Sequence, residues 1–370
     1  MSARFLTVVL ERAFNMRDGF GREIDYMRIS VIDSCNLNCY YCNPCGNNEH
    51  CHALNILSVK EVLCIVRAAT RLGIKHFRLT GGEPLLHPQL DEMVLQIKKI
   101  PGVSSVSLTT NAVLLAQHAK WLKEAGIDSI NVSLDTIDAS EYERITKKPL
   151  LEEVKHGINA AIECGIRVKI NVVLTPQTDV VALTRYVAKK GTDIRFIEMM
   201  PVGEGHTNGV EPYKKVIGTL SKLYGEPCRI NTEKTKEINS GNDKREIPDN
   251  GPAEYYIFPE LGIRVGLIQA IHGKFCDTCN RIRVTADGRL MPCLGSSVTM
   301  DLVPDSWDFA DDVEKDFAIV RALRAAIKAK PRCHNFNDNA VTYTKTTETK
   351  TTEIEAAEVN AARNMSRIGG

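Results

Sequence analysis

Residues 26 to 200 alternate between short apolar runs rich in β-branched residues and longer runs in which apolar residues recur every three or four positions. The first pattern is typical of buried strands and the second of amphipathic helices. The predicted strands are 26–33, 75–80, 103–110, 127–135, 166–175 and 193–200. The predicted helices are 58–72, 89–99, 114–125, 151–164 and 178–190. Successive strand–helix units predict an α/β fold with a parallel sheet, either open and doubly wound or a partial TIM-like barrel.

Unusual residues gather at the carboxyl ends of these predicted strands. They are Cys35, Gly81, Gly82, Glu83, Pro84, Thr109, Ser133, Asp135, Met199 and Met200. Any one of them could be an ordinary turn or core residue, but the coincidence across successive strands is informative. Because ligands bind at this edge in barrels and in open α/β sheets alike, we expect the site here.

The character of the chain changes after residue 203, where Lys, Asn, Glu and Gly dominate and residues 211–225 carry a short helical pattern. We interpret this change as the passage into a second module, and polar residues 342–362 as a flexible linker. The expected parts are an N-terminal extension, the sheet-bearing domain, a module with a second cysteine set, and a C-terminal segment ending in Gly-Gly, with the limits 1–24, 25–202, 203–300 and 301–370.

Cys35, Cys39 and Cys42 follow the first predicted strand at C-x3-C-x2-C spacing. Three thiolates so close in sequence can bind three irons of a 4Fe-4S cubane and leave the fourth iron open to an outside ligand. A zinc knuckle would need a fourth ligand, for which Cys45, Cys51 or a nearby histidine are candidates. A rival, ferredoxin-like register would use Cys39, Cys42 and Cys45.

A second set consists of Cys276, Cys279 and Cys293. Asp287-Gly288 is a two-residue hairpin signal, and symmetric pairing about it places Cys293 opposite Ile282 and close to Cys279. The three thiols can therefore converge without a fourth cysteine. A zinc site here would need a further ligand, such as His272 or Cys333.

Strand alternation places Arg281 and Arg283 on one face of this hairpin. Two guanidinium groups held side by side can clamp a phosphate group. Random surface arginines on an exposed hairpin are the ordinary alternative.

Composition narrows the class of protein. The 370 residues carry a formal net charge of +1 and 43% are hydrophobic, which allows a large core but gives no general attraction to nucleic acid or to membranes. No apolar run approaches the ~18 residues of a membrane-spanning helix. Twelve cysteines without a secretory signal indicate metal or redox chemistry in a reducing compartment, which we expect to be the cytoplasm.

The first cysteine set, with Tyr41 before its third cysteine and a GGEP element downstream, resembles the radical S-adenosyl-L-methionine (SAM) superfamily. The resemblance implies a partial (βα)6 TIM-like barrel and a 4Fe-4S cluster at which SAM is cleaved to a 5′-deoxyadenosyl radical. The implied SAM-binding residues are Tyr41, Gly81, Gly82, Glu83, Ser133 and Met200. The implied contacts to the second substrate are Arg28, Arg78, Thr109 and Lys169. A buried salt bridge is the ordinary alternative for Arg28 and Lys169, which lie inside apolar strands.

The chain is further similar to one family of this superfamily, the GTP 3′,8-cyclases of molybdenum cofactor biosynthesis. The similarity rests on residues 20–42, 251–268 and 276–294 and on the final SRIGG. It implies conversion of GTP to (8S)-3′,8-cyclo-7,8-dihydroguanosine 5′-triphosphate, in which the ribose 3′ hydrogen is removed and the 3′ carbon attacks guanine C8.

The same similarity implies a lyase with two 4Fe-4S clusters, the second of which binds the guanine base. It assigns substrate contacts to Arg281, Ile282 and Arg283 and catalytic roles to Arg28, Lys169 and Arg367. Implied partners are a reductant such as flavodoxin or ferredoxin, the downstream cyclic pyranopterin monophosphate synthase, and a second copy in a homodimer.

The sequence also departs from this family. Ser34 stands where an arginine is common, Gly295 replaces an aromatic residue, and residues 296–363 match weakly. These departures leave open a peptide- or protein-modifying radical SAM enzyme with an auxiliary cluster. A non-catalytic iron–sulfur electron carrier is a third hypothesis, although a carrier has no use for the polar residues at the strand ends.

Overall fold

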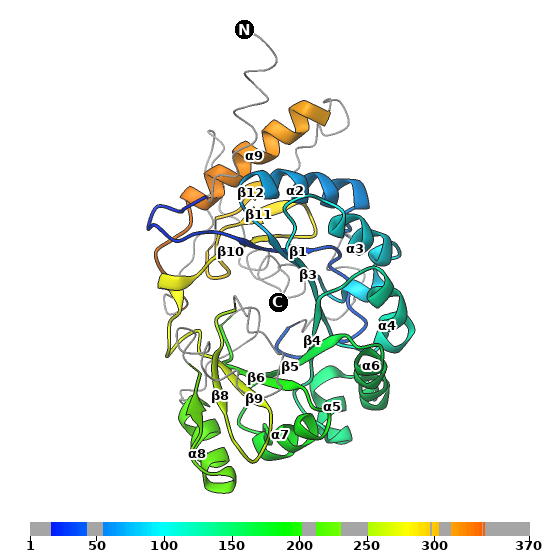
Figure 1. Cartoon of the computed structure of the whole chain (residues 1–370), viewed down its shortest axis with the longest axis vertical. Coiled ribbons are helices and arrows are strands. Elements are labelled where there is room, and N and C mark those ends of the chain that lie inside the picture. Colours follow the sequence, from blue (N-terminus) through cyan, green and yellow to red (C-terminus); the bar gives the residue numbers. More distant parts are fainter. Residues whose placement is uncertain are drawn as a thin grey trace, which may run out of the picture.

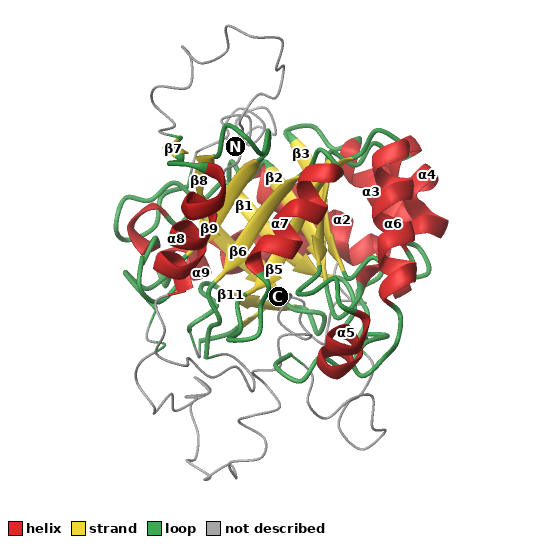
Figure 2. Cartoon of the chain, turned by 90° about the horizontal axis from the view of Figure 1, so that it is seen from below, coloured by secondary structure: helices red, strands yellow, loops and turns green. Residues whose placement is uncertain are grey.

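The computed structural model describes residues 16–42, 55–201, 212–230, 251–296, 298–302, 312–334 and 336. In this part of the chain one continuous sheet carries the fold, with the strand order β12-β11-β10-β1-β2-β3-β4-β5-β6-β9-β8-β7. Figure 1 shows the strands following an arc, and Figure 2 shows the helices lying around the outside of it.

The six strands expected between residues 26 and 200 are confirmed, and neighbouring strands among them are parallel. They are β1 (Tyr26–Ser30), β2 (His76–Thr80), β3 (Ser105–Thr110), β4 (Ser129–Ser133), β5 (Arg167–Val173) and β6 (Asp193–Ile197). The later strands are β7 (Cys228–Arg229), β8 (Glu254–Ile257), β9 (Arg264–Ile268), β10 (Arg281–Val284), β11 (Arg289–Met291) and β12 (Met300–Asp301). This arrangement agrees with a partial TIM-like barrel.

The helices expected from the apolar pattern are confirmed as α2 (Val59–Arg71), α3 (Leu90–Lys98), α4 (Leu115–Glu124), α6 (Leu151–Glu163), α7 (Val180–Lys189) and α8 (Pro212–Tyr224). Two further helices, α5 (Ala139–Thr146) and α9 (Asp312–Lys328), are absent from the sequence prediction. The first is short and mostly polar, and it begins where the Asp138 side chain accepts a hydrogen bond from the Glu141 amide. The second lies in the weakly matched segment and packs against α2.

The two faces of the arc differ in chemistry. Alternate residues such as Met27, Phe77 and Ile130 are fully buried in the hydrophobic core between the strands and the helices. The residues between them on the other face are largely polar or basic yet also buried, and include Arg78, Asn131, Lys169 and Arg195. Cations inside strands that read as apolar therefore belong to a polar inner face.

The C-terminal residues extend the sheet at both ends. Strand β9 pairs in parallel with β6, and β10 pairs in parallel with β1. The second cysteine set is thereby placed beside the strand that leads to the first. Strands from both sides of residue 203 share one sheet. The domain limits given above stay a prediction.

The predicted hairpin register is wrong by one residue. Strands β10 and β11 pair Arg283 with Met291 and Val284 with Leu290. Continued along both strands, this register places Arg281, not Ile282, opposite Cys293. The loop contains three residues, because Thr285 donates its amide to the carbonyl of Arg289 at 2.8 Å. Gly288 takes a φ of 75° at the end of this loop, the left-handed conformation that a three-residue hairpin needs.

None of the helices in the described ranges is long and apolar enough to cross a membrane. The predicted linker at 342–362 lies outside the described residues, as do Cys45 of the rival register and Arg367.

Candidate active site

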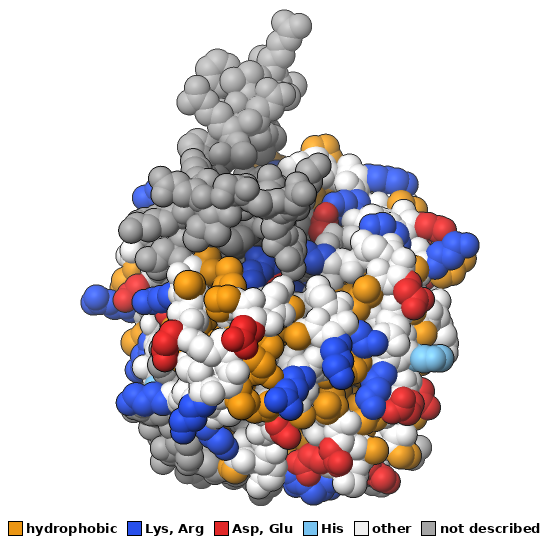
Figure 3. Space-filling view, turned by 60° about the horizontal axis from the view of Figure 1, so that its bottom comes forward, with side chains coloured by type: hydrophobic (Ala, Val, Ile, Leu, Met, Phe, Trp, Pro, Cys, Tyr) orange, Lys and Arg blue, Asp and Glu red, His pale blue; other side chains and the backbone are white. Residues whose placement is uncertain are grey.

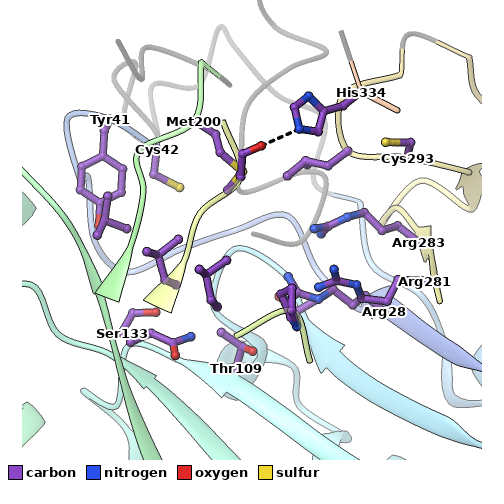
Figure 4. Close-up of a pocket in the computed structure, with 18 of the residues that line it drawn as sticks. Arg28, Tyr41, Cys42, Thr109, Ser133, Met200, Arg281, Arg283, Cys293 and His334 are labelled. Carbon is purple, nitrogen blue, oxygen red and sulfur yellow. Dashed lines mark hydrogen bonds between the residues drawn. The ribbon is translucent and has the colours of Figure 1, made fainter. Parts of the chain in front are cut away.

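A cavity of about 280 Å³ lies at the carboxyl ends of the parallel strands. All six cysteines of the two predicted sets line it, together with Arg28, Arg281 and Arg283. Figure 4 shows Cys42 and Cys293 on opposite sides of the cavity, with the three arginines on the Cys293 side. Two sets that lie far apart in sequence therefore face one space.

The other predicted contact residues divide into two groups. Those that line the cavity are Tyr41, Gly81, Gly82, Thr109, Ser133 and Met200. Those that are buried and absent from its lining are Arg78, Glu83, Lys169 and Ile282. The placement of Ile282 differs from the expectation, because strand alternation turns its side chain into the core, away from Arg281 and Arg283.

The Glu83 side chain is buried and bonds to residues of the next strand end, and it does not line the cavity. Its carboxylate accepts hydrogen bonds from the Leu85 amide at 3.0 Å, the Thr110 hydroxyl at 2.7 Å and the Asn111 amide at 2.7 Å. Complete burial raises the pKa of this carboxyl to about 7, although these hydrogen bonds oppose the shift. Glu83 thus ties the end of β2 to the end of β3.

Gly81 and Gly82 allow close backbone contact with the first cysteine loop. A Cβ on Gly82 would lie 2.1 Å from the carbonyl oxygen of Ser34, and one on Gly81 would lie 2.4 Å from that of Ile32. The Gly82 amide donates to the Ile32 carbonyl at 2.7 Å. A side chain at either position would displace the backbone that leads into Cys35.

Helix α5 supports the same loop from the other side. The amide of Asn38 donates to the carbonyl of Thr146 at 3.0 Å, and the amide of Tyr40 donates to that of Ile145 at 3.2 Å. The last carbonyl groups of a helix have no partner within the helix. The cysteine loop satisfies two of them and is fixed in return.

Two polar contacts bring further strand ends to this loop. The Tyr41 hydroxyl donates to the carboxylate of Asp135, which also accepts from the Val173 amide at 2.8 Å. Burial raises the pKa of Asp135 to about 6. Asn111, which sequence reasoning missed, donates to the side-chain oxygen of Asn36 at 2.7 Å. Asn111 directly follows β3 and carries the same strand-end signal as Thr109.

Residues that follow α9 complete the second side of the cavity, and the sequence pattern does not indicate them. Lys330, His334 and Phe336 line it. A Cβ on Gly295 would lie 2.7 Å from the Cβ of His334 and 3.0 Å from the ring of Phe336. The Phe336 ring thus occupies the space beside position 295, which accounts for the glycine there.

The arginines create a strongly positive region in the cavity. Burial, and then the charge of Arg283, hold the pKa of Arg28 well below its usual range. Burial and the charge of Arg281 lower the pKa of Arg283 to about 10. Within the described residues the Nε atom of Arg28 has no hydrogen-bond partner. A polyanionic ligand would supply both the charge and the acceptors that this arrangement favours.

This positive charge is local. Figure 3 shows Lys and Arg side chains interspersed with Asp, Glu and hydrophobic side chains on the face that it presents. The formal net charge of the chain is only +1. Attraction of an anion therefore depends on the cavity and not on the field of the whole protein.

The chemistry of each cysteine set fits an iron–sulfur cluster. No three His, Cys, Asp or Glu side chains of the described residues converge as one metal ion would require. A cubane has no such requirement, because each thiolate binds a different iron. Cys35, Cys39 and Cys42 nevertheless influence one another electrostatically, as do Cys276, Cys279 and Cys293. Each set can therefore hold three irons of a 4Fe-4S cluster.

Two family models match the chain. The Radical SAM superfamily model covers residues 29–182, and the Molybdenum Cofactor Synthesis C model covers residues 192–336. The second match continues beyond residue 300, where the expected similarity weakens, and it includes α9 and the residues that follow it.

Similar proteins include the GTP 3′,8-cyclase of Clostridium perfringens (strain SM101 / Type A), 35% identical over 324 residues that span 87% of this chain and 95% of that protein. The GTP 3′,8-cyclase of Petrotoga mobilis is 36% identical over 331 residues, 88% of this chain and 96% of that protein. Among solved structures, Streptococcus suis SuiB bound to precursor peptide SuiA has a TM-score of 0.55 and 15% identity, with coverage of 87% and 69%. The last likeness concerns the fold alone.

Proposed function

The chain belongs to the GTP 3′,8-cyclase family of radical SAM enzymes, and from this premise we propose how the residues around its cavity carry out the reaction. The protein converts GTP to (8S)-3′,8-cyclo-7,8-dihydroguanosine 5′-triphosphate, the first step of molybdenum cofactor biosynthesis, and we assign it to the lyases. The observation that carries this function is a single cavity lined by two three-cysteine sets and three arginines.

Each cysteine set would hold one 4Fe-4S cluster, the first with Cys35, Cys39 and Cys42 and the second with Cys276, Cys279 and Cys293. When bound, the first cluster with SAM supplies a hydrogen-abstracting radical, and the second supplies an open iron for the guanine base. The residues of this chain that we assign to SAM are Tyr41, Gly81, Gly82, Ser133 and Met200, all in the cavity wall.

Arg281 and Arg283 bind the triphosphate, because paired guanidinium groups match phosphate oxygens bidentately. Arg28 lies in register with both Arg283 and Arg78 on neighbouring strands, and its unpartnered Nε would take a further oxygen. Arg78 donates to the Thr109 hydroxyl at 3.4 Å and therefore orients a residue of the cavity wall. We propose that the buried Lys169 adds to the positive potential that attracts the ligand.

The reaction removes a hydrogen atom from C3′ of the ribose, and SAM, when bound, would supply the group that accepts this atom. A bond then forms between C3′ and guanine C8, and one electron and one proton reduce the base, so that the product is an isomer of GTP. Methionine and 5′-deoxyadenosine are the products of SAM. One electron for SAM cleavage and one for the base come from a reductant such as flavodoxin or ferredoxin.

The product is a cyclised nucleotide that requires a further rearrangement, and we propose cyclic pyranopterin monophosphate synthase as its consumer. We further propose a homodimer located in the cytoplasm. The cytoplasmic location is supported by the cysteines of the described residues, none of which forms a disulfide bond.

The test uses GTP that carries deuterium at C3′, incubated anaerobically with the reconstituted chain, SAM and a reductant. We expect the deuterium to appear in 5′-deoxyadenosine and a new nucleotide to separate from GTP by chromatography. Cys39→Ala should abolish both products, whereas Cys164→Ala, outside both sets, should retain them. Formation of unlabelled 5′-deoxyadenosine without a new nucleotide would reject GTP as the substrate and favour a peptide substrate.

A further inference from the structure

Lys330 is a buried lysine just after α9, with only 3% of its surface exposed. Its ammonium donates to the carbonyl of Arg281 at 2.7 Å and to that of Pro292 at 2.9 Å. It also hydrogen-bonds the thiol of Cys279. An ammonium group has three donors, and here they reach the start of β10, the residue before Cys293, and Cys279 itself.

Residues 330–334, called the strap below, are fixed against the second cysteine set. The ring of His334 donates through Nε2 to the carbonyl of Ala270 at 2.6 Å. The guanidinium of Arg22 donates to the carbonyl of Cys276 at 2.7 Å and to two carbonyls of the strap at 2.6 and 2.9 Å. The strap therefore contributes a hydrogen bond to the sulfur of Cys279, and Arg22 ties it to the backbone of Cys276.

Two cations lie beside the Cys279 sulfur. The charges of Arg281 and Lys330 both act on this thiol, and both side chains line the cavity together with the second cysteine set. Hydrogen bonds to the sulfurs and the surrounding charge are what set the reduction potential of an iron–sulfur cluster.

We propose that Lys330 is a positioning residue for the second 4Fe-4S cluster, and that its buried charge and its hydrogen bond to Cys279 raise the reduction potential of that cluster. Reduction adds negative charge to the cluster, and a nearby cation stabilises the reduced state more than the oxidised one. The inference rests on the second cluster of the proposed function and does not depend on the substrate.

The test is a redox titration of the second cluster, followed by electron paramagnetic resonance without GTP. The full chain carries Cys35→Ser, Cys39→Ser and Cys42→Ser, so that only the second cluster contributes. We expect Lys330→Met to lower the ratio of reduced to oxidised cluster at least tenfold at a fixed potential, about 59 mV for a one-electron couple. Lys330→Arg should keep the potential close to that of the unmodified cluster. Lys328→Met, on the exposed side of α9, should cause no shift.

An unchanged potential in a Lys330→Met protein that retains its iron would overturn the proposal. If this variant loses iron, Lys330→Gln decides, because glutamine can donate to the same carbonyls without a charge. A wild-type potential in Lys330→Gln overturns the proposal, and a lowered potential supports it. If Lys330→Gln loses iron as well, the arginine variant decides. Iron retained only by the unmodified chain and by Lys330→Arg also supports the proposal. Loss of iron from Lys330→Arg too would show that the shape of the side chain, not its charge, matters. Cyclase activity enters none of these readings.

Discussion

At the scale of single residues, Arg28 shows how a binding site opposes the stability of the fold. Its side chain is half-buried, its Nε atom is buried without a hydrogen-bond partner in the described part of the chain, and the charge of Arg283 acts on the same guanidinium. A buried charge without compensating hydrogen bonds destabilises a protein, whereas an apolar side chain of similar shape does not. An anionic ligand reverses the sign of this contribution.

We therefore expect Arg28→Met to raise the free energy of unfolding of the ligand-free protein by about 1 kcal/mol or more. The same change should weaken GTP binding at least tenfold, because a charged hydrogen bond contributes about 1.5–3 kcal/mol. Urea denaturation and titration calorimetry measure the two effects. Arg67→Met, on the exposed face of α2, should change neither quantity. A destabilised Arg28→Met protein would show that the fold itself depends on the guanidinium.

At the scale of elements, the two helices absent from the sequence prediction are the ones that support the cysteines. Two carbonyl groups at the carboxyl end of α5 accept hydrogen bonds from amides of the first cysteine loop. Helix α9 leads into the strap, whose Lys330 reaches Arg281 and Pro292. The turn at Gly81 and Gly82 completes the support of the first loop by direct backbone contact.

Gly82→Ala tests this contact, because its Cβ would lie 2.1 Å from the Ser34 carbonyl oxygen, backbone that cannot give way cheaply. We expect displacement of the first cysteine loop and loss of its cluster, so that iron falls from about eight to about four per chain. Gly218→Ala in α8, where no atom lies within 4 Å, should keep all the iron. Iron analysis after anaerobic reconstitution measures both variants, and a full complement in Gly82→Ala would contradict the argument.

At the scale of the whole molecule, the site exists because C-terminal strands join both ends of the barrel sheet. The join between β6 and β9 contains a buried ion pair, in which Arg264 donates through Nε to the Asp193 carboxylate at 3.1 Å. The Arg264 amide donates to the same carboxylate at 3.3 Å. Removal of one partner from such a pair leaves the other charge buried and uncompensated.

Asp193→Ala should therefore lower the free energy of unfolding by about 3–5 kcal/mol and increase hydrogen exchange in β9. Glu152→Ala breaks an exposed pair with Lys155 at 2.8 Å and should cost at most about 0.5 kcal/mol. The double change Asp193→Leu with Arg264→Met should recover most of the loss, because no charge remains buried. Equal costs for Asp193→Ala and Glu152→Ala would mean that the pair does not stabilise the join.

The sequence by itself determined the strands and most of the helices between residues 26 and 200. Apolar periodicity reports local backbone geometry, so neighbours in the chain are sufficient to predict it. The same order placed Thr109, Ser133 and Met200 at one edge of the sheet, because parallel strands end together. Cysteine spacing indicated two sets for the same reason, since each lies within a short segment.

Only the tertiary structure decided the contacts that cross the sheet. The register at Cys293 depended on a three-residue loop that the Asp287-Gly288 signal did not distinguish from a two-residue turn. The burial of Glu83 depended on the path of the backbone after β2, which brings its carboxylate to Thr110 and Asn111 at the end of the next strand. Lys330 bonds carbonyls 49 and 38 positions away in the chain, and local periodicity carries no information about such partners, because they become neighbours only when the curved sheet brings its two ends around one cavity.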